Sequence, residues 1–138
     1  CSLAVSFSPL DTGIQLDAVQ PEPLADDQAA VPATPGSGAK VKNFVKCGYP
    51  LPGFDMEIRS PEGRCLPERR VGTLFVRGPS VMSGYFGEET LTREVLSRDG
   101  WLNTGDLAYV VDGSLIITGR QKDLIIINGR NIWPQDLE

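Results

Sequence analysis

The side chains best suited to bind a ligand gather in one stretch near the end of the sequence, between residues 100 and 133. Four short polar motifs lie there, each at the end of a predicted strand: Gly105-Asp106, Gly119-Arg120, Lys122-Asp123 and Asn128-Gly129-Arg130. A carboxylate can accept two hydrogen bonds from a vicinal diol, and a guanidinium can bind anionic or hydroxylated groups through its fork. This chemistry suits the ribose of a nucleotide, although Gly-Asp and Gly-Arg are also common turn dipeptides.

The usual catalytic motifs are absent from the sequence. The chain contains no histidine, which excludes a Ser-His-Asp triad, a Cys-His pair and any histidine-ligated zinc site. Neither the G-x-x-x-x-G-K-[ST] phosphate loop nor a G-x-G-x-x-G fingerprint occurs. The adjacent acidic pairs Asp26-Asp27 and Glu88-Glu89 are interpreted as solvated surface, because neighbours in sequence do not converge as an acid and a base.

Length and composition predict one domain rich in turns and short strands. The 138 residues include 15 Gly and 11 Pro, which disfavours a helix bundle. The net charge of −5 disfavours a nucleic-acid partner, and no apolar run approaches the roughly 18 residues of a membrane span. The three scattered cysteines, Cys1, Cys47 and Cys65, indicate neither a disulfide framework nor a metal site and favour a reducing, cytoplasmic setting.

Alternating and apolar segments predict the elements that must position the polar motifs. Short strands are expected at residues 3–7, 14–19, 41–47, 54–59 and 71–77, and one internal helix at residues 88–97. The segments 41–47 and 54–59 are expected to pair as an antiparallel ladder. The segment 21–40, rich in Pro, Ala and Gly, is interpreted as a mobile surface loop.

Two hairpins are predicted to carry the polar motifs. Asp112-Gly113 joins residues 106–111 to 114–118, and Asn128-Gly129 joins residues 123–127 to 130–133. Asp-Gly and Asn-Gly are the dipeptides that best suit tight hairpin turns.

The two ends of the sequence suggest that it is part of something longer. Residues 134–138 begin like a helix, with Pro first and acids following, yet one turn of helix is not stable alone. We therefore expect an excised piece of a longer protein. The alternative for the start is a lipid-anchored mature protein that begins at Cys1.

Three motifs, in this order and spacing, resemble the adenylate-forming superfamily of acyl-CoA synthetases, peptide-synthetase adenylation domains and luciferases. They are a block within residues 72–86, then Gly100-Trp-Leu-Asn-Thr-Gly-Asp-Leu107, then Gly119-Arg-Gln-Lys-Asp-Leu-Ile-Ile-Ile-Asn-Gly-Arg-Asn131. Within the superfamily, residues 45–53 and 129–138 are most similar to fatty acyl-AMP ligases. The resemblance covers nearly the whole chain and is least secure over residues 21–40.

The resemblance implies a mainly β fold, a distorted β-barrel subdomain with short hairpins and one or two short helices. Residues 1–121 would form the last subdomain of a large adenylation lobe, and residues 122–138 the hinge and the first hairpin of a small C-terminal lobe. Trp101 and Tyr109 are expected to be packing residues, and Gly84-Tyr85 a turn, rather than direct ligand contacts.

The resemblance also assigns site residues. Asp106 is expected to hold the ribose hydroxyls of ATP and of the acyl-adenylate, and Arg120 to add a second contact on the ribose side. Lys122 would occupy the hinge, and Gly129 the hairpin that approaches the thiol acceptor. The phosphate-gripping loop and the catalytic lysine of the family have no counterpart in this sequence, so no catalytic residue and no metal ligand is assigned to it.

The implied parent is a fatty acyl-AMP ligase of fatty acid metabolism. It would activate a fatty acid with ATP and Mg²⁺ and pass the acyl group to the phosphopantetheine of an acyl carrier protein, while this chain alone would be inactive. One alternative is an acyl-CoA or aryl-CoA ligase that uses coenzyme A as the acceptor. Another is a noncatalytic interaction module that retains the fold.

Overall fold

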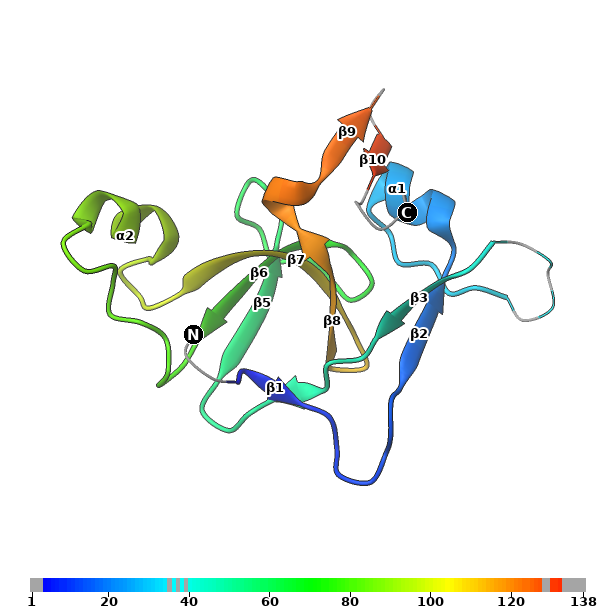
Figure 1. Cartoon of the computed structure of the whole chain (residues 1–138), viewed down its shortest axis with the longest axis horizontal. Coiled ribbons are helices and arrows are strands. Elements are labelled where there is room, and N and C mark those ends of the chain that lie inside the picture. Colours follow the sequence, from blue (N-terminus) through cyan, green and yellow to red (C-terminus); the bar gives the residue numbers. More distant parts are fainter. Residues whose placement is uncertain (1–3, 35, 37, 39, 128–129, 133–138) are drawn as a thin grey trace.

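The computed structural model describes residues 4–34, 36, 38, 40–127 and 130–132. These residues form mainly short strands with few helices (Figure 1), which confirms the mainly β prediction. The elements are β1 Ser6–Phe7, β2 Leu16–Val19, α1 Pro21–Asp27, β3 Lys42–Val45, β4 Tyr49–Pro50, β5 Asp55–Arg59, β6 Gly72–Arg77, α2 Glu89–Val95, β7 Leu102–Val111, β8 Ser114–Arg120, the 3-10 helix η1 Gln121–Asp123, β9 Ile125–Ile127 and β10 Arg130–Ile132. No helix among the described residues is long and apolar enough to cross a membrane.

An antiparallel sheet in the order β5-β6-β7-β8 lies at the centre of the molecule, and two-stranded ribbons β1–β4, β2–β3 and β9–β10 accompany it. The backbone N–H of Cys47 donates to the carbonyl of Leu115 at 2.7 Å, and the N–H of Leu115 donates to the carbonyl of Gly48 at 2.8 Å. These bonds attach the segment between β3 and β4 to the edge of β8. The strand network therefore continues from the central sheet into the ribbons (Figure 1), in the β-rich arrangement that the sequence predicts.

Strand pairing confirms both predicted hairpins and corrects one predicted ladder. β7 pairs with β8 across the Asp112-Gly113 turn, and β9 pairs with β10, whose connecting residues 128–129 lie outside the described part of the chain. The expected ladder between segments 41–47 and 54–59 is wrong, because β3 pairs with β2 and β5 pairs with β6. Two turns at Gly48 and Gly53, both with φ of 83°, lie between the segments and lead the chain from one sheet into another.

The interpretation of residues 21–40 as a loop is wrong for its first part, which forms helix α1. Pro21 stands at the start of the helix, where its fixed φ suits the first turn, and Gln28 ends the helix in a left-handed conformation with φ of 53°. Leu24 is fully buried in the core. Tertiary burial of this one leucine outweighs a local composition that favours turns.

Two apolar clusters form the core, one on each side of the central sheet. The first contains Val19, Leu24, Ala30, Phe44, Val71, Leu107, Tyr109, Val111 and Ile116, and the second contains Ile58, Leu74, Val76, Leu102, Ala108 and Leu115. Neighbours along β7 and β8 belong to different clusters, as the two-residue period of a strand requires. β7 therefore lies between the two clusters and is fixed by both.

A buried carboxylate, that of Asp17, lies beside the first apolar cluster. Asp17, only 8% exposed, accepts hydrogen bonds from both terminal nitrogens of Arg69 at 3.2 Å and from the Tyr109 hydroxyl at 2.8 Å. Arg69 also donates to the carbonyl of Ala30 at 3.0 Å. Burial, together with the hydrogen bond to Asp17 and its charge, raises the pKa of Tyr109 far above its ordinary value, so this hydroxyl stays a donor. The fully buried Tyr109 has the packing role expected for it.

Large apolar side chains are exposed along the ribbons that accompany the sheet. Leu16 of β2 is the direct cross-strand partner of Val45 in β3, and both are exposed. Phe7 of β1 and Tyr49 of β4 form a second pair of this kind. Apolar side chains that gather on a surface in this way mark places where other protein commonly packs.

We expect Tyr109→Phe to lower the free energy of unfolding by about 1.5–3 kcal/mol, because the change removes a donor to a buried, charged carboxylate. Urea-induced unfolding followed by fluorescence measures this difference. The matched control is Tyr49→Phe, which removes an exposed hydroxyl and should change the stability by less than about 0.5 kcal/mol. Equal effects of the two substitutions would contradict a structural role for the Tyr109 hydroxyl.

Candidate functional site

Asp106 and Arg120 face each other across β7 and β8. They are direct partners in the strand register, and Nε of Arg120 lies 3.2 Å from Oδ1 of Asp106. The side chain of Asp106 is 27% exposed and that of Arg120 is 59% exposed. The structure thus brings these two predicted site residues together at a place that solvent and a ligand can reach.

Lys122 lies in η1, directly after the end of β8. Together with Thr104, Gly105, Arg120 and Gln121 it lines a pocket of about 380 Å³, a volume within the range of small-molecule sites. Two cationic side chains on the pocket wall and the neighbouring Asp106 carboxylate suit a ligand that carries hydroxyl groups and negative charge. Gly129, the fourth predicted site residue, lies outside the described residues.

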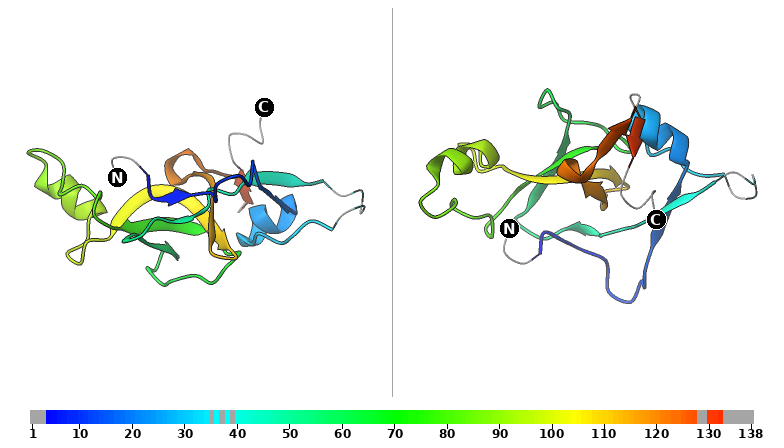
Figure 2. Two further views of the ribbon diagram at one scale, coloured as in Figure 1. Left: turned by 90° about the horizontal axis from the view of Figure 1, so that it is seen from below. Right: turned by 45° about the horizontal axis from the view of Figure 1, so that its top comes forward.

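A bulge in β7 shapes the backbone just before Asp106. Thr73 of β6 pairs with Leu107 and Phe75 pairs with Asn103, so three residues of β7 lie opposite Leu74 alone. Such a bulge interrupts the regular ladder and bends the strand, and the strong curve of β7 is visible in Figure 2. Gly105 lies within the bulge with φ of 73°, in the left-handed region that favours glycine.

Two side chains supply the hydrogen bonds that the interrupted ladder lacks. Oδ1 of Asn103 accepts from the N–H of Gly105 at 2.9 Å. Oγ1 of Thr104 donates to the carbonyl of Leu74 at 3.0 Å and accepts from the N–H of Asp106 at 3.1 Å. The sequence interpretation overlooked both residues, although two short polar side chains beside a glycine in a strand are a recognisable bulge signal.

A second irregularity lies on the other side of β7, in its pairing with β8. Leu107 pairs with Gly119 whereas Ala108 pairs with Ile117, which leaves Thr118 as an extra residue. The buried hydroxyl of Thr118 donates to the carbonyl of Leu107 at 3.1 Å. Leu107, the residue after Asp106, is therefore held by β6 on one side and by β8 on the other. Asp106 is the last of the three bulged residues.

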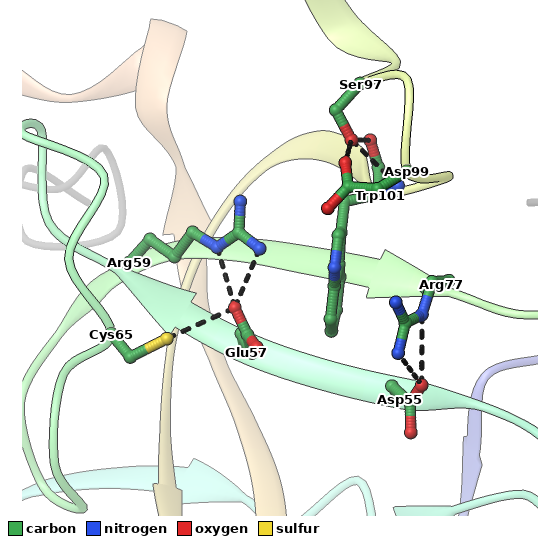
Figure 3. A network of polar contacts seen from close by, with 8 residues as sticks. All are labelled: Asp55, Glu57, Arg59, Cys65, Arg77, Ser97, Asp99 and Trp101. Carbon is green, nitrogen blue, oxygen red and sulfur yellow. Dashed lines mark hydrogen bonds and ion pairs between the residues drawn. The ribbon is translucent and has the colours of Figure 1, made fainter.

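A second polar cluster lies on β5, β6 and the residues just before β7 (Figure 3), beside a pocket of about 480 Å³ that Asp55, Arg77 and Trp101 help to line. The Trp101 ring lies between the guanidinium groups of Arg59 and Arg77, at 4.9 and 4.7 Å from the ring centroid. Arg59 pairs with Glu57 and Arg77 pairs with Asp55, each at 2.7 Å. Trp101 is buried, which confirms its expected packing role, and the two arginines are neutralised by their carboxylates.

Cys65 belongs to the same cluster, with its Sγ 3.2 Å from Oε2 of Glu57. Partial burial opposes ionisation of Glu57, but hydrogen bonds from Cys65 and Arg59, together with the nearby positive charges, lower its pKa below the ordinary value. The hydrogen bond to Glu57, with some desolvation, raises the pKa of the Cys65 thiol. This thiol is thus kept protonated, the opposite of what a nucleophilic cysteine requires.

The comparisons with known proteins agree on one group of enzymes. A family model described as AMP-binding enzyme matches residues 29–86. A protein of Caulobacter vibrioides (strain NA1000 / CB15N) named "Putative acyl-CoA synthetase" is 50% identical over 99% of this chain and 24% of its own length. The chain thus spans about a quarter of that relative.

Solved structures give a similar picture. A structure from work on fatty acyl-adenylate ligases of E. coli and L. pneumophila matches with a TM-score of 0.88 and 47% identity, over 98% of this chain and 24% of the other. An adenylation domain of a keto acid-selecting NRPS module, solved with a keto acyl adenylate bound, matches with a TM-score of 0.72 and 34% identity, over 89% of this chain and 22% of the other.

We expect Glu57→Gln to make Cys65 more reactive toward iodoacetamide at pH 8. The change removes the carboxylate that raises the thiol pKa, so more of the reactive thiolate is present at that pH. The rate is measured in a Cys1→Ser, Cys47→Ser background, where Cys65 is the one remaining thiol.

The control for this test is Glu62→Gln. Glu62 lies in the turn between β5 and Cys65, but its carboxylate accepts a hydrogen bond from the Ser60 hydroxyl at 2.7 Å, whereas Cys65 bonds to Glu57. Its substitution should leave the alkylation rate unchanged, and a rate that does not respond to Glu57→Gln would contradict the assigned cause.

Proposed function

The chain belongs to the AMP-binding, adenylate-forming enzymes, and on this basis we propose that it supplies the ribose-side wall of their nucleotide site. Residues 1–121 would complete a large adenylation lobe, and residues 122–138 would begin the hinge and a small C-terminal lobe. Two observations support a place for this chain within a larger protein. The relatives are about four times as long as this chain, since it covers 24% of them, and the exposed apolar ribbons offer a surface for further protein to pack on.

The cross-strand pair of Asp106 and Arg120, beside the Lys122 pocket, is the observation that carries the proposal. In the proposed reaction a carboxylate oxygen of a fatty acid attacks the α-phosphorus of ATP. The bond to the β,γ-phosphates breaks, and acyl-adenylate and pyrophosphate form. Asp106 would accept hydrogen bonds from the ribose hydroxyls and Arg120 would add a second contact, so both would fix the nucleotide in place without transferring a proton.

We assign ATP with Mg²⁺ as the nucleotide substrate but assign no metal ligand to this chain. Among the described residues no group of three or more Cys, Asp or Glu side chains is arranged to hold a metal ion. The chain contributes hydrogen-bonding and positively charged groups, and these suit ribose and phosphate.

Lys122 is proposed as the hinge about which the small lobe turns. It lies in η1, a single short 3-10 turn between β8 and β9. The ribbon β9–β10 forms a sheet separate from the central one, which supports a boundary at this turn. Gly129 is proposed to belong to the hairpin that approaches the thiol acceptor.

A fatty acid is the proposed acid substrate and the phosphopantetheine of an acyl carrier protein the proposed acceptor. The strong match to a structure from work on fatty acyl-adenylate ligases supports the fatty acid, while the carrier acceptor is what the family resemblance implies. Coenzyme A is the second candidate, because the relative from Caulobacter is named as an acyl-CoA synthetase.

Both described cysteines, Cys47 and Cys65, are free thiols, which supports the proposed cytoplasmic setting.

We expect Asp106→Ala in the full-length protein to raise the KM for ATP by about ten- to a hundredfold. The change removes a charged acceptor, a loss of roughly 1.5–3 kcal/mol of binding free energy in all. ATP-pyrophosphate exchange measures the effect. Asp55→Ala is the matched control. Asp55 and Arg77 form the same kind of cross-strand ion pair on β5 and β6, and neither residue lines the Lys122 pocket.

Unchanged exchange kinetics in Asp106→Ala would overturn the site assignment. If the wild-type protein itself neither exchanges pyrophosphate nor binds a nonhydrolysable acyl-adenylate mimic, the noncatalytic module would replace the proposed enzyme.

We expect the full-length protein to transfer a radiolabelled acyl group from acyl-adenylate to a phosphopantetheinylated carrier protein faster than to coenzyme A. Thioester formation with each acceptor, at equal thiol concentration, measures the preference. An apo carrier without the phosphopantetheine arm is the control and should accept nothing. Faster transfer to coenzyme A would establish the acyl-CoA ligase alternative.

A further inference from the structure

We propose that Thr104 is a positioning residue for the nucleotide site, and that its hydroxyl fixes Asp106 to the core of the central sheet. This inference rests on the proposed role of Asp106 in holding ribose. Thr104 also lines the Lys122 pocket, but in this proposal its hydroxyl acts on the backbone of Asp106 and not on the nucleotide itself.

The Thr104 hydroxyl joins two backbone groups that the bulge separates. It donates to the carbonyl of Leu74 in β6 at 3.0 Å and accepts from the N–H of Asp106 at 3.1 Å. In a regular ladder the two strands would pair these groups directly, but three β7 residues lie opposite Leu74 here. One side-chain oxygen therefore replaces the missing link between β6 and the site.

The far end of this link is rigid. Leu74 is buried, with its side chain packed in the second apolar cluster beside Ile58 and Val76. Its carbonyl is consequently held by the core, and the hydroxyl transmits that position to Asp106. Leu107, the next residue, is fixed by its pairing with Thr73 and by the Thr118 hydroxyl.

The remaining freedom lies between Asn103 and Asp106. Gly105 has no side chain to restrict it, and its N–H is held by Asn103. Without the Thr104 hydroxyl, the N–H of Asp106 would lose the side-chain acceptor that now holds it at 3.1 Å. Because recognition of a diol depends on placing both carboxylate oxygens accurately, a displacement of even about 1 Å should weaken nucleotide binding.

Thr104→Val tests the proposal, since valine keeps the branched shape that suits a strand and removes both hydrogen bonds. Calorimetric titration of the full-length protein with a nonhydrolysable acyl-adenylate mimic should show binding about three- to thirtyfold weaker. In pyrophosphate exchange the KM for ATP should rise by a similar factor, while kcat and the KM for the acid change little. Thr104→Ser, which keeps the hydroxyl, should restore binding to near the wild-type value.

Thr92→Val is the matched control. The Thr92 hydroxyl in α2 makes the same two kinds of bond, because it donates to the carbonyl of Glu88 and accepts from the N–H of Tyr85, both at 2.9 Å. It is not among the residues that line the Lys122 pocket. This variant should lose some thermal stability and keep its affinity for the mimic.

Each outcome has a definite meaning. Equal losses of affinity in Thr104→Val and Thr92→Val, or wild-type affinity in Thr104→Val, would overturn the positioning role. If Thr104→Val does not fold, Thr104→Ala and Thr104→Ser give the same comparison, and equal affinity of those two would overturn it. Asp106→Ala, titrated in parallel, separates the two proposals: if Asp106→Ala also binds normally, the proposed function itself fails.

Discussion

The pairing of β7 with both of its neighbours is the constraint on which the rest of the structure depends. Its side chains alternate between the two apolar clusters, so the strand cannot rotate without exposing one of them. Within this fixed strand the ladder is interrupted only around Asp106, by one irregularity toward β6 and one toward β8. The candidate site therefore lies where the strand leaves its regular geometry, immediately beside residues that keep it.

The buried Asp17 links this strand to the N-terminal ribbons. Removing a carboxylate from water is costly unless charged and neutral donors replace the lost hydration. Arg69 and Tyr109 supply those donors from the loop before β6 and from β7, respectively. Because three distant segments must be in place to satisfy one carboxylate, this contact favours a single arrangement of the β2–β3 ribbon on the sheet.

Local signals in the sequence predicted the parts of the fold that local chemistry controls. The Asp112-Gly113 turn and the apolar segments beside it were enough to predict a hairpin of residues 106–111 and 114–118. The structure extends both strands, to Leu102 and to Arg120, and this longer pairing places Asp106 opposite Arg120. Helix α1 could not be predicted in this way, because it depends on burial of Leu24 against residues distant in sequence. The burial of Asp17 could not be predicted either, because only the complete fold brings its partners Arg69 and Tyr109 to it.

Two ion pairs of the same kind show what distinguishes a structural contact from a candidate site. Asp55–Arg77 and Asp106–Arg120 both join direct partners on neighbouring antiparallel strands. The guanidinium of Arg77 stacks on the buried Trp101 and directs two nitrogens to one carboxylate oxygen, so its bonding groups are largely used within the protein. Arg120 meets Asp106 through Nε and lines a pocket beside Lys122, and the Thr104 hydroxyl links the backbone of Asp106 to β6 in place of the regular ladder. Residue types and strand pairing are the same in both places, and a pocket lies beside each pair. The irregular backbone, rather than the ion pair or a pocket as such, therefore makes Asp106 the better candidate to bind a ligand.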